Sequence, residues 1–294
     1  MSRLDFDRDG ADWPHRDASR FVRAAGMRWH VQVAGTGPAI LLVHGTGAAS
    51  HSWRGSFATL AARFQVVAPD LPGHAFTEPP PRDEYGTASM ALQLEALLAA
   101  LGVRPHLAIG HSAGAALLAR MALDGRLAAA AIASVNGALR EPMGFSWRLF
   151  GPAARLLAST SLAAHAVSAI ADPHRVGRMA ESTGSTLDAQ GIDLYSRLAA
   201  SPGHVGAVLA MMAQWDLPGV ERDLPKLATP LELAVGEGDL AVPAAEADRI
   251  RKLVPGPAPC RWPRLGHLAH EEAPQAFLAW IDEVLARHPP GVPA

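Results

Sequence analysis

The residues that could do chemistry begin with a serine in a glycine-rich turn. Ser112 is the centre of Gly110-His111-Ser112-Ala113-Gly114, which follows an apolar run and opens an alanine-rich segment. Placed between a buried strand and a helix, G-x-S-x-G is a nucleophile elbow, a sharp turn that strains the serine backbone and needs small neighbours. The pattern predicts an exposed Ser112 hydroxyl at the carboxyl edge of a sheet. The alternative is a glycine-rich turn with an incidental serine.

A serine hydroxyl is a weak nucleophile until a base removes its proton. On strand–helix topologies that use Ser, His and an acid, the acid and then the histidine follow the serine in the chain. Asp239 comes just after an apolar run, and His267 lies in the loop before the last predicted helix. We expect Asp239 to fix the tautomer of His267, and His267 to act as base and then as acid.

Two other residues compete with Asp239 for the role of the acid. Glu237 lies in the same loop, but Asp239 sits further along it, where its side chain can turn back toward the serine. Asn136 ends the preceding strand, which is another place from which an acid could come. Because its side chain is an amide, Asn136 cannot serve as the acid.

His270 is the alternative to His267 as the base. It is followed by Glu271 and Glu272. Two adjacent carboxylates indicate the solvated start of a helix, so we favour His267.

An oxyanion formed during acyl transfer needs two hydrogen-bond donors, which contribute the largest electrostatic effect in many such enzymes. One should be the backbone N–H of Ala113, directly after the nucleophile. The other should be the N–H of Thr46 in His44-Gly45-Thr46-Gly47, where two glycines let the backbone approach closely. We interpret His44 as a structural brace of this loop, with a second base as the alternative, and His111 as a packing neighbour of the elbow.

The elements that must position these residues alternate along the chain. Residues 21–24 and 27–33 alternate apolar and polar side chains and predict a hairpin, whereas 39–43 is a continuous apolar run typical of a buried strand. Further strands are predicted at 64–68, 106–110, 128–135, 231–235 and 259–262, and helices at 53–63, 87–101, 113–123, 244–253 and 274–287. This order predicts an α/β fold with a mostly parallel sheet, helices on both faces and an antiparallel edge.

Between residues 139 and 219 the alternation stops. This stretch is rich in Ala, Leu, Met, Phe and Trp and has no strand-like runs. We therefore predict three parts: an N-terminal arm (1–19) that packs late or not at all, a core (20–138 with 220–294) and a helical cap (139–219). Apolar cap residues that could line a pocket are Phe145, Trp147, Met211 and Trp215, and the alternative is that they only hold the cap helices together; Met143, Phe150, Met179 and Met212 are weaker candidates.

Composition excludes several classes of protein. The chain has 294 residues, 18% of them charged, and a formal net charge of −2, so it has no general attraction to nucleic acid or anionic membranes. The single cysteine, Cys260, excludes an internal disulfide and a cysteine-built metal site, and the scattered histidines predict no metal or other cofactor. No signal peptide and no apolar run of about 18 residues is visible. We expect a cytoplasmic protein without a transmembrane segment.

From about Arg20 onward the chain resembles the α/β-hydrolase superfamily. The loop 44–47, Asp70-Leu71-Pro72-Gly73-His74, the elbow, Gly236-Glu237-Gly238-Asp239 and Gly266-His267 follow one another in the order of that family. The resemblance implies an α/β-hydrolase fold. A serine at the elbow separates the chain from the dehalogenase and epoxide-hydrolase branches, in which the nucleophile is an aspartate.

A closer resemblance is to the magnesium chelatase accessory proteins of bacteriochlorophyll biosynthesis (the BchO group). Residues 12–14, 18–22, 42–53 and 134–139 look like that group, whereas Ala75 stands where the group usually has glycine. The resemblance implies a role beside magnesium insertion into protoporphyrin IX, with magnesium chelatase subunits as possible partners. It does not establish a reaction.

Two hypotheses follow. The first is a serine hydrolase that acts on a carboxylic ester or a related apolar acyl compound, with a tetrapyrrole ester or a lipid as candidate substrates. The second is a non-catalytic accessory protein that binds porphyrin or the chelatase. The complete set of Ser112, Asp239 and His267 favours the hydrolase.

Overall fold

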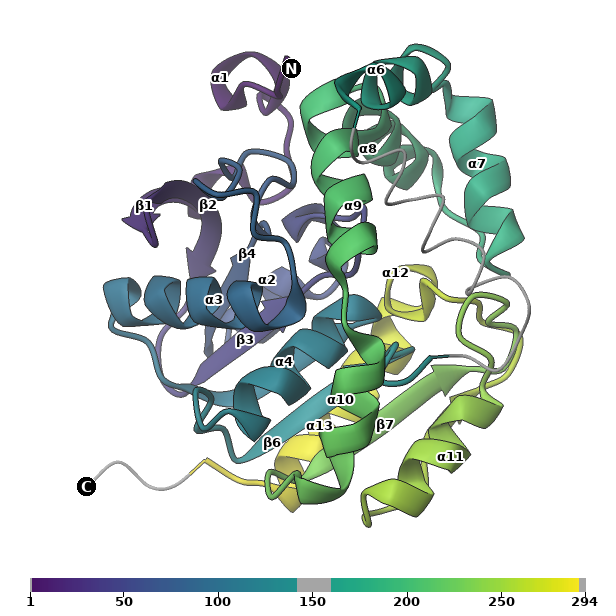
Figure 1. Cartoon of the computed structure of the whole chain (residues 1–294). Helices are drawn as coiled ribbons and strands as arrows, with labels where there is room; N and C mark the ends of the chain where they lie inside the picture. Colours follow the sequence, from purple (N-terminus) through teal and green to yellow (C-terminus); the bar gives the residue numbers. More distant parts are fainter. Residues whose placement is uncertain (1, 142–159, 291–294) are drawn as a thin grey trace.

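The computed structural model describes residues 2–141 and 160–290, and within these ranges one eight-stranded sheet forms the centre of the molecule (Figure 1). The strand order is β1-β2-β4-β3-β5-β6-β7-β8. β2 is antiparallel to both β1 and β4, and all other neighbours are parallel, which confirms the predicted α/β class and its antiparallel edge. The strands are β1 Ser19–Ala24, β2 Met27–Ala34, β3 Ala39–Val43, β4 Gln65–Pro69, β5 Pro105–His111, β6 Ala131–Val135, β7 Leu231–Gly236 and β8 Cys260–Trp262.

Helices cover both faces of the sheet, because alternate side chains of each buried strand point to opposite sides. Leu41 and Val43 join one apolar core, and Ile40 and Leu42 join the other. The first core includes α3 (Thr87–Leu101), α4 (Ala113–Leu123), α10 (Leu217–Asp223) and α11 (Ala245–Leu253); the second includes α2 (Phe57–Ala61) and α13 (Pro274–Arg287).

The helix predicted at 53–63 is wrong in part, because a 3-10 helix (Ser50–Trp53) and α2 replace it. Gly55 separates the two, and a Cβ at Gly55 would lie 2.9 Å from the Cβ of Pro274. Glycine is the weakest helix former after proline. The chain therefore turns here and brings Pro274, the first residue of α13, against the turn.

The described part of the predicted cap is helical, as expected. α6 (Ser161–Ala169), α7 (Pro173–Ser182), α8 (Ala189–Ala199) and α9 (Pro202–Gln214) form a group beside one end of the sheet (Figure 1). Pro173 and Pro202 open α7 and α9, where a missing N–H does no harm. The side chains of Asp172, Asp188 and Ser201 cap the first turns of α7, α8 and α9.

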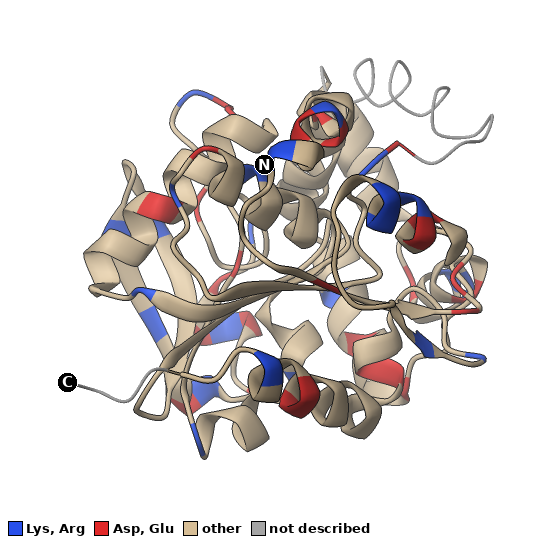
Figure 2. Cartoon of the chain, turned by 90° about the horizontal axis from the view of Figure 1, so that it is seen from below, with Lys and Arg blue, Asp and Glu red and all other residues tan. Residues whose placement is uncertain are grey.

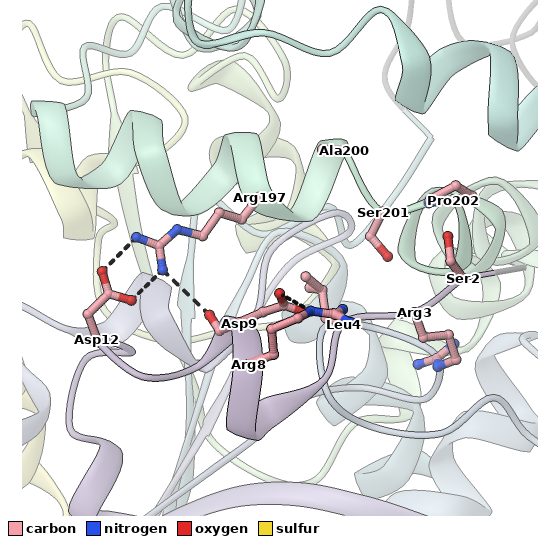
Figure 3. A pocket seen from close by; sticks show the side chains of 10 residues that line it. All are labelled: Ser2, Arg3, Leu4, Arg8, Asp9, Asp12, Arg197, Ala200, Ser201 and Pro202. Carbon is pink, nitrogen blue, oxygen red and sulfur yellow. Dashed lines mark hydrogen bonds and ion pairs between the residues drawn. The ribbon is translucent and has the colours of Figure 1, made fainter.

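The first residues of the chain pack against the cap, so the expectation that the arm could remain unpacked is wrong. Trp13 is 2% exposed and shares a third apolar cluster with Leu194 of α8. Arg197 of α8 forms an ion pair with Asp12, and a groove of about 470 Å³ lies between the arm and the start of α9 (Figure 3). A single buried tryptophan carries no periodicity, and for that reason the sequence pattern did not reveal the packing.

Basic and acidic residues are interspersed along the ribbon of the described part of the chain (Figure 2), in agreement with the small net charge. Within the same residues, no helix has both the length and the apolar character required to cross a bilayer.

Candidate active site

The predicted turn at Ser112 joins β5 to α4. Its backbone is strained, with φ 50° and ψ −118°. The neighbouring glycines are needed for space: a Cβ at Gly110 would lie 2.5 Å from the backbone nitrogen of Ala115, and one at Gly114 would lie 2.3 Å from the carbonyl oxygen of Val43. The turn therefore holds Ser112 at the carboxyl end of β5, at the start of the next helix.

The structure brings Ser112, His267 and Asp239 into one hydrogen-bonded row. The Nε2 atom of His267 is 3.0 Å from the Oγ atom of Ser112, and its Nδ1 atom is 2.8 Å from Oδ2 of Asp239. A carboxylate only accepts, so Nδ1–H donates to Asp239 and Nε2 is left to accept the serine proton. The other carboxylate oxygen of Asp239 accepts the N–H groups of Ala241 and Val242, each at 2.8 Å.

Asn136 is a fourth member of this row. Its side-chain amide donates to Oδ2 of Asp239 at 2.6 Å and to the carbonyl oxygen of Gly266 at 3.3 Å. The Asp239 side chain is fully buried, so a neighbouring carboxylate would repel it, whereas an amide neutralises part of its charge. Sequence reasoning considered Asn136 only as an acid. Its position at the end of β6, next to the strand that leads to Asp239, was the signal for its role as a donor.

Residues 38–274 match the family model described as alpha/beta hydrolase fold. The chain belongs to this family. The 30 kDa subunit of magnesium chelatase from Rhodobacter capsulatus is 37% identical over 279 residues, which cover 92% of this chain and 97% of that protein. Both resemblances predicted from the sequence motifs are thereby confirmed.

Solved structures share the fold of this α/β-hydrolase. A Burkholderia ambifaria protein of the same fold superposes with a TM-score of 0.76 at 23% identity, covering 91% of this chain and 98% of that one. A thermophilic esterase from Thermogutta terrifontis gives 0.73 at 22% identity, covering 92% and 98%. At these identities the likeness extends to the fold alone.

In this α/β-hydrolase the loop after β3 is braced as predicted. His44 donates from Nδ1 to the carbonyl of Gly45 at 2.8 Å and accepts the N–H of Leu71 at Nε2, at 2.9 Å. Both ring nitrogens are therefore engaged in the brace. His111 donates from Nε2 to the carbonyl of His267, 2.9 Å away, and burial lowers its pKa well below the usual value.

The two residues predicted to supply the oxyanion donors adjoin the serine. Ala113 is the first residue of α4, and the first N–H groups of a helix have no carbonyl partner within it. The loop of Thr46 packs on the elbow, since a Cβ at Gly45 would lie 3.0 Å from the Cβ of Ser112. The donor role of both backbones remains a prediction.

His270 does not stand at a solvated helix start, and that expectation is wrong. It is 2% exposed, and its ring centroid lies 4.5 Å from the rings of both Trp53 and His111. Burial lowers the pKa of His270 to about 3. Within the described residues, neither ring nitrogen has a hydrogen-bond partner. It is His267 that reaches Ser112.

Glu271 is buried because the cap covers it. It forms an ion pair with Arg54 and accepts the hydroxyl of Tyr195 on α8 at 2.8 Å. Burial, which outweighs the effect of Arg54, raises the pKa of Glu271 to about 7. The side chain of the other candidate acid, Glu237, is 47% exposed and lies 4.0 Å from Arg261, whereas the hydrogen bond of His267 to a carboxylate goes to Asp239.

Of the predicted pocket residues that the structure describes, Met211 contacts the loop of Thr46. It is fully buried, and its sulfur accepts the hydroxyl of Thr46 at 3.7 Å. Trp215 packs against the apolar core around α3 and α4. Phe145 and Trp147, with Met143 and Phe150, lie outside the described residues. Met179 is 59% exposed and is turned away from the core. Among the described residues, no group of His, Cys, Asp and Glu is arranged to hold a metal ion.

Proposed function

We propose that this α/β-hydrolase is a serine hydrolase that cleaves a carboxylic ester or a related acyl compound. The observation that carries the proposal is the continuous row from the strained Ser112 through His267 to the buried Asp239, with separations of 3.0 and 2.8 Å. Acyl transfer needs three parts: an exposed, strained serine, an imidazole whose acceptor nitrogen faces the hydroxyl, and a carboxylate that fixes the imidazole.

In the first half of the reaction, the Oγ atom of Ser112 attacks the carbonyl carbon of the substrate while Nε2 of His267 takes its proton. The carbonyl oxygen becomes an oxyanion, which the N–H groups of Ala113 and Thr46 stabilise. The imidazolium then gives its proton to the leaving oxygen, so an alcohol departs and an acyl-serine remains. Asp239 stabilises the imidazolium and stays ionised.

In the second half, water replaces the alcohol. His267 takes a proton from the water, whose oxygen attacks the acyl carbon, and then returns the proton to Ser112. A carboxylic acid leaves, and the serine is restored. The three side chains end each cycle in their starting protonation states, so the reaction requires no cofactor.

The substrate class follows from the cap and from the relative. Buried Met211 beside Thr46 favours an apolar acyl or ring-bearing group. Because the related Rhodobacter protein is named as a subunit of magnesium chelatase, we infer a role in bacteriochlorophyll biosynthesis near magnesium insertion, with a tetrapyrrole ester as substrate and chelatase subunits as partners.

The direct test is labelling with a fluorophosphonate, which forms a covalent bond with an activated serine. We expect attachment to Ser112 and loss of both labelling and p-nitrophenyl ester turnover in Ser112→Ala. Ser182→Ala is the matched control, because that hydroxyl lies exposed on α7 and donates only to the Met179 carbonyl among its observed contacts. Full labelling of Ser112→Ala would remove Ser112 from the mechanism.

The second candidate is a non-catalytic accessory that binds porphyrin or the chelatase, and the name of the Rhodobacter relative favours it. Complementation of a deletion strain separates the two. Ser112→Ala removes one hydroxyl and leaves the fold and its surfaces intact. Restored pigment with Ser112→Ala would support the accessory, whereas failure at normal protein levels would support the hydrolase. A deletion with unaltered pigments would refute the pathway assignment.

A further inference from the structure

The last turn of cap helix α7 ends in a way that leaves two hydrogen-bond acceptors free to bond to other segments of the chain. The N–H of Ser185 bonds to the carbonyl of Ala180 at 3.1 Å, and that of Gly184 bonds to Glu181 at 2.9 Å. With Gly184 at φ +82°, this is a Schellman motif, a common helix ending that uses a left-handed glycine. The carbonyl of Thr183 and the hydroxyl of Ser185 remain available for other contacts.

The carbonyl of Thr183 joins the two loops that carry Asp239 and His267. It accepts the N–H of Leu240, the residue after the acid, at 3.1 Å. It also accepts the N–H of His267 itself at 3.3 Å. One cap atom therefore holds both loops at the points where their functional side chains begin.

The amides on either side of His267 bond to the same turn and to Glu272. The hydroxyl of Ser185 accepts the N–H of Leu268 at 2.8 Å. Glu272 accepts the N–H of Gly266 at 3.0 Å with one carboxylate oxygen and the N–H of Thr186 at 3.2 Å with the other. The backbone N–H groups of residues 266 to 268 thus all have an acceptor here. Two of them bond to the turn, and the third bonds to Glu272, which also bonds to the residue after the turn.

Three glycines bring the turn and the loops into backbone contact. A Cβ at Gly184 would lie 1.9 Å from the carbonyl oxygen of Gly238, and one at Gly266 would lie 2.2 Å from the carbonyl carbon of Gly184. Real Cβ atoms are not found so close to backbone. Figure 1 shows the lower end of α7 beside the loops around α12 (Ala269–Glu272).

We propose that the turn formed by Thr183, Gly184 and Ser185 is a positioning element for His267. The cap then does more than cover the substrate, because the geometry of proton transfer depends on the contact between this turn and the histidine loop. The inference rests on the proposed function, and it assigns to the end of α7 a part in catalysis that needs no contact with substrate.

The competing explanation is that these bonds only stabilise the cap. It predicts that weakening them lowers the free energy of unfolding but leaves turnover by the folded protein unchanged. Positioning predicts a different result. An error of about 1 Å in a reacting group can lower a rate roughly a hundredfold, so turnover falls in protein that is still fully folded.

The test compares Ser185→Ala with Ser182→Ala, two serine-to-alanine changes three residues apart. Only Ser185→Ala removes a hydroxyl that accepts an N–H group of the histidine loop, that of Leu268. With p-nitrophenyl butyrate, at a temperature where circular dichroism shows both variants folded, we expect kcat of Ser185→Ala to fall roughly 10- to 100-fold and KM to stay within about twofold. Ser182→Ala should match the unmodified protein. An unchanged kcat in Ser185→Ala would overturn the proposal.

A spectroscopic measurement makes the proposal independent of activity. The proton on Nδ1 of His267, hydrogen-bonded to Asp239, should give a far-downfield NMR signal, which we expect to broaden or vanish in Ser185→Ala and in Glu272→Gln. A signal of unmodified shape in both variants would refute positioning. If the unmodified protein neither labels with fluorophosphonate nor turns over esters, the proposed function fails, and this signal still decides the role of the turn.

Discussion

Replacing His270 by phenylalanine should stabilise the protein in mild acid. The ring is buried among Trp53, His111 and Phe277, and burial holds its pKa at about 3. In the unfolded chain the pKa of histidine is about 6.5. As the pH falls, the unfolded state binds the proton first. The contribution of a neutral His270 to the free energy of unfolding is therefore fully present above pH 6.5 and decreases as the pH falls toward 3.

The size of this effect follows from the two pKa values. At pH 5.5, keeping one imidazole neutral destabilises the folded state by about 1.4 kcal/mol relative to pH 8. Because phenylalanine cannot take up a proton, it makes no pH-dependent contribution to the free energy of unfolding. Any change in packing that it introduces is the same at both pH values. The difference in stability between His270→Phe and the unmodified protein should therefore shift by about 1.4 kcal/mol in favour of the variant.

Guanidinium unfolding curves at pH 8 and pH 5.5 measure this shift directly. His174→Phe, at an exposed position on α7, is the control for a histidine-to-phenylalanine change outside the core. A His270→Phe effect that is independent of pH would refute the assignment of a buried, neutral His270.

Three further outcomes can be measured. The buried histidines whose pKa is lowered should together destabilise the fold as the pH falls below about 6.5, and the raised pKa of Glu271 compensates only part of this; unfolding curves followed by circular dichroism should therefore give a lower free energy of unfolding at pH 5.5 than at pH 8, and equal values would contradict this. These histidines are His44, His51, His74, His111, His204 and His270. Asp239→Asn should keep the fold but lower kcat about 10⁴-fold as tautomer control is lost; an unchanged kcat would point to Glu237. Asn136→Asp places a second carboxylate on Asp239, and at neutral pH kcat should fall at least about tenfold, with stability lower by roughly 1–3 kcal/mol; kcat and unfolding curves equal to those of the unmodified protein would contradict the role given to the amide.

Much of the fold could be predicted because local signals mark it. The helix Thr87–Leu101 has the predicted bounds, since Gly86 caps its start and Gly102, at φ +65°, ends it. The elbow at Ser112 could be predicted for the same reason: its glycines are needed by contacts only a few residues away or with the adjacent strand. The strand β3 has the predicted bounds, whereas the other strands differ by one to three residues at one or both ends, because pairing with neighbours, rather than side-chain pattern, decides where a strand ends.

The errors arose where distant segments meet. The two glutamates after His270 suggested solvent, but Arg54 and Tyr195, both far away in the chain, bury Glu271. The turn at Ser185 contacts Leu268 across 83 positions, and no periodic pattern marks it. The same holds for Trp13, whose neighbours include Phe76 of the core and Leu194 of the cap. Contacts of this kind depend on the assembled tertiary structure, which a local pattern does not contain.

The packing of the arm on the cap has a consequence for biosynthesis. Asp12 and Arg197 are 185 positions apart, and the carbonyl of Ser2 accepts the N–H of Gly203 at the start of α9. At about 5–20 residues per second, a ribosome needs roughly 10 to 40 seconds to make that distance. During this interval the arm can already meet core residues such as His51 and Phe76, which contact the ring of Trp13, but its contacts with the cap cannot form. The segment that is translated first therefore completes its tertiary contacts only after the cap has been made.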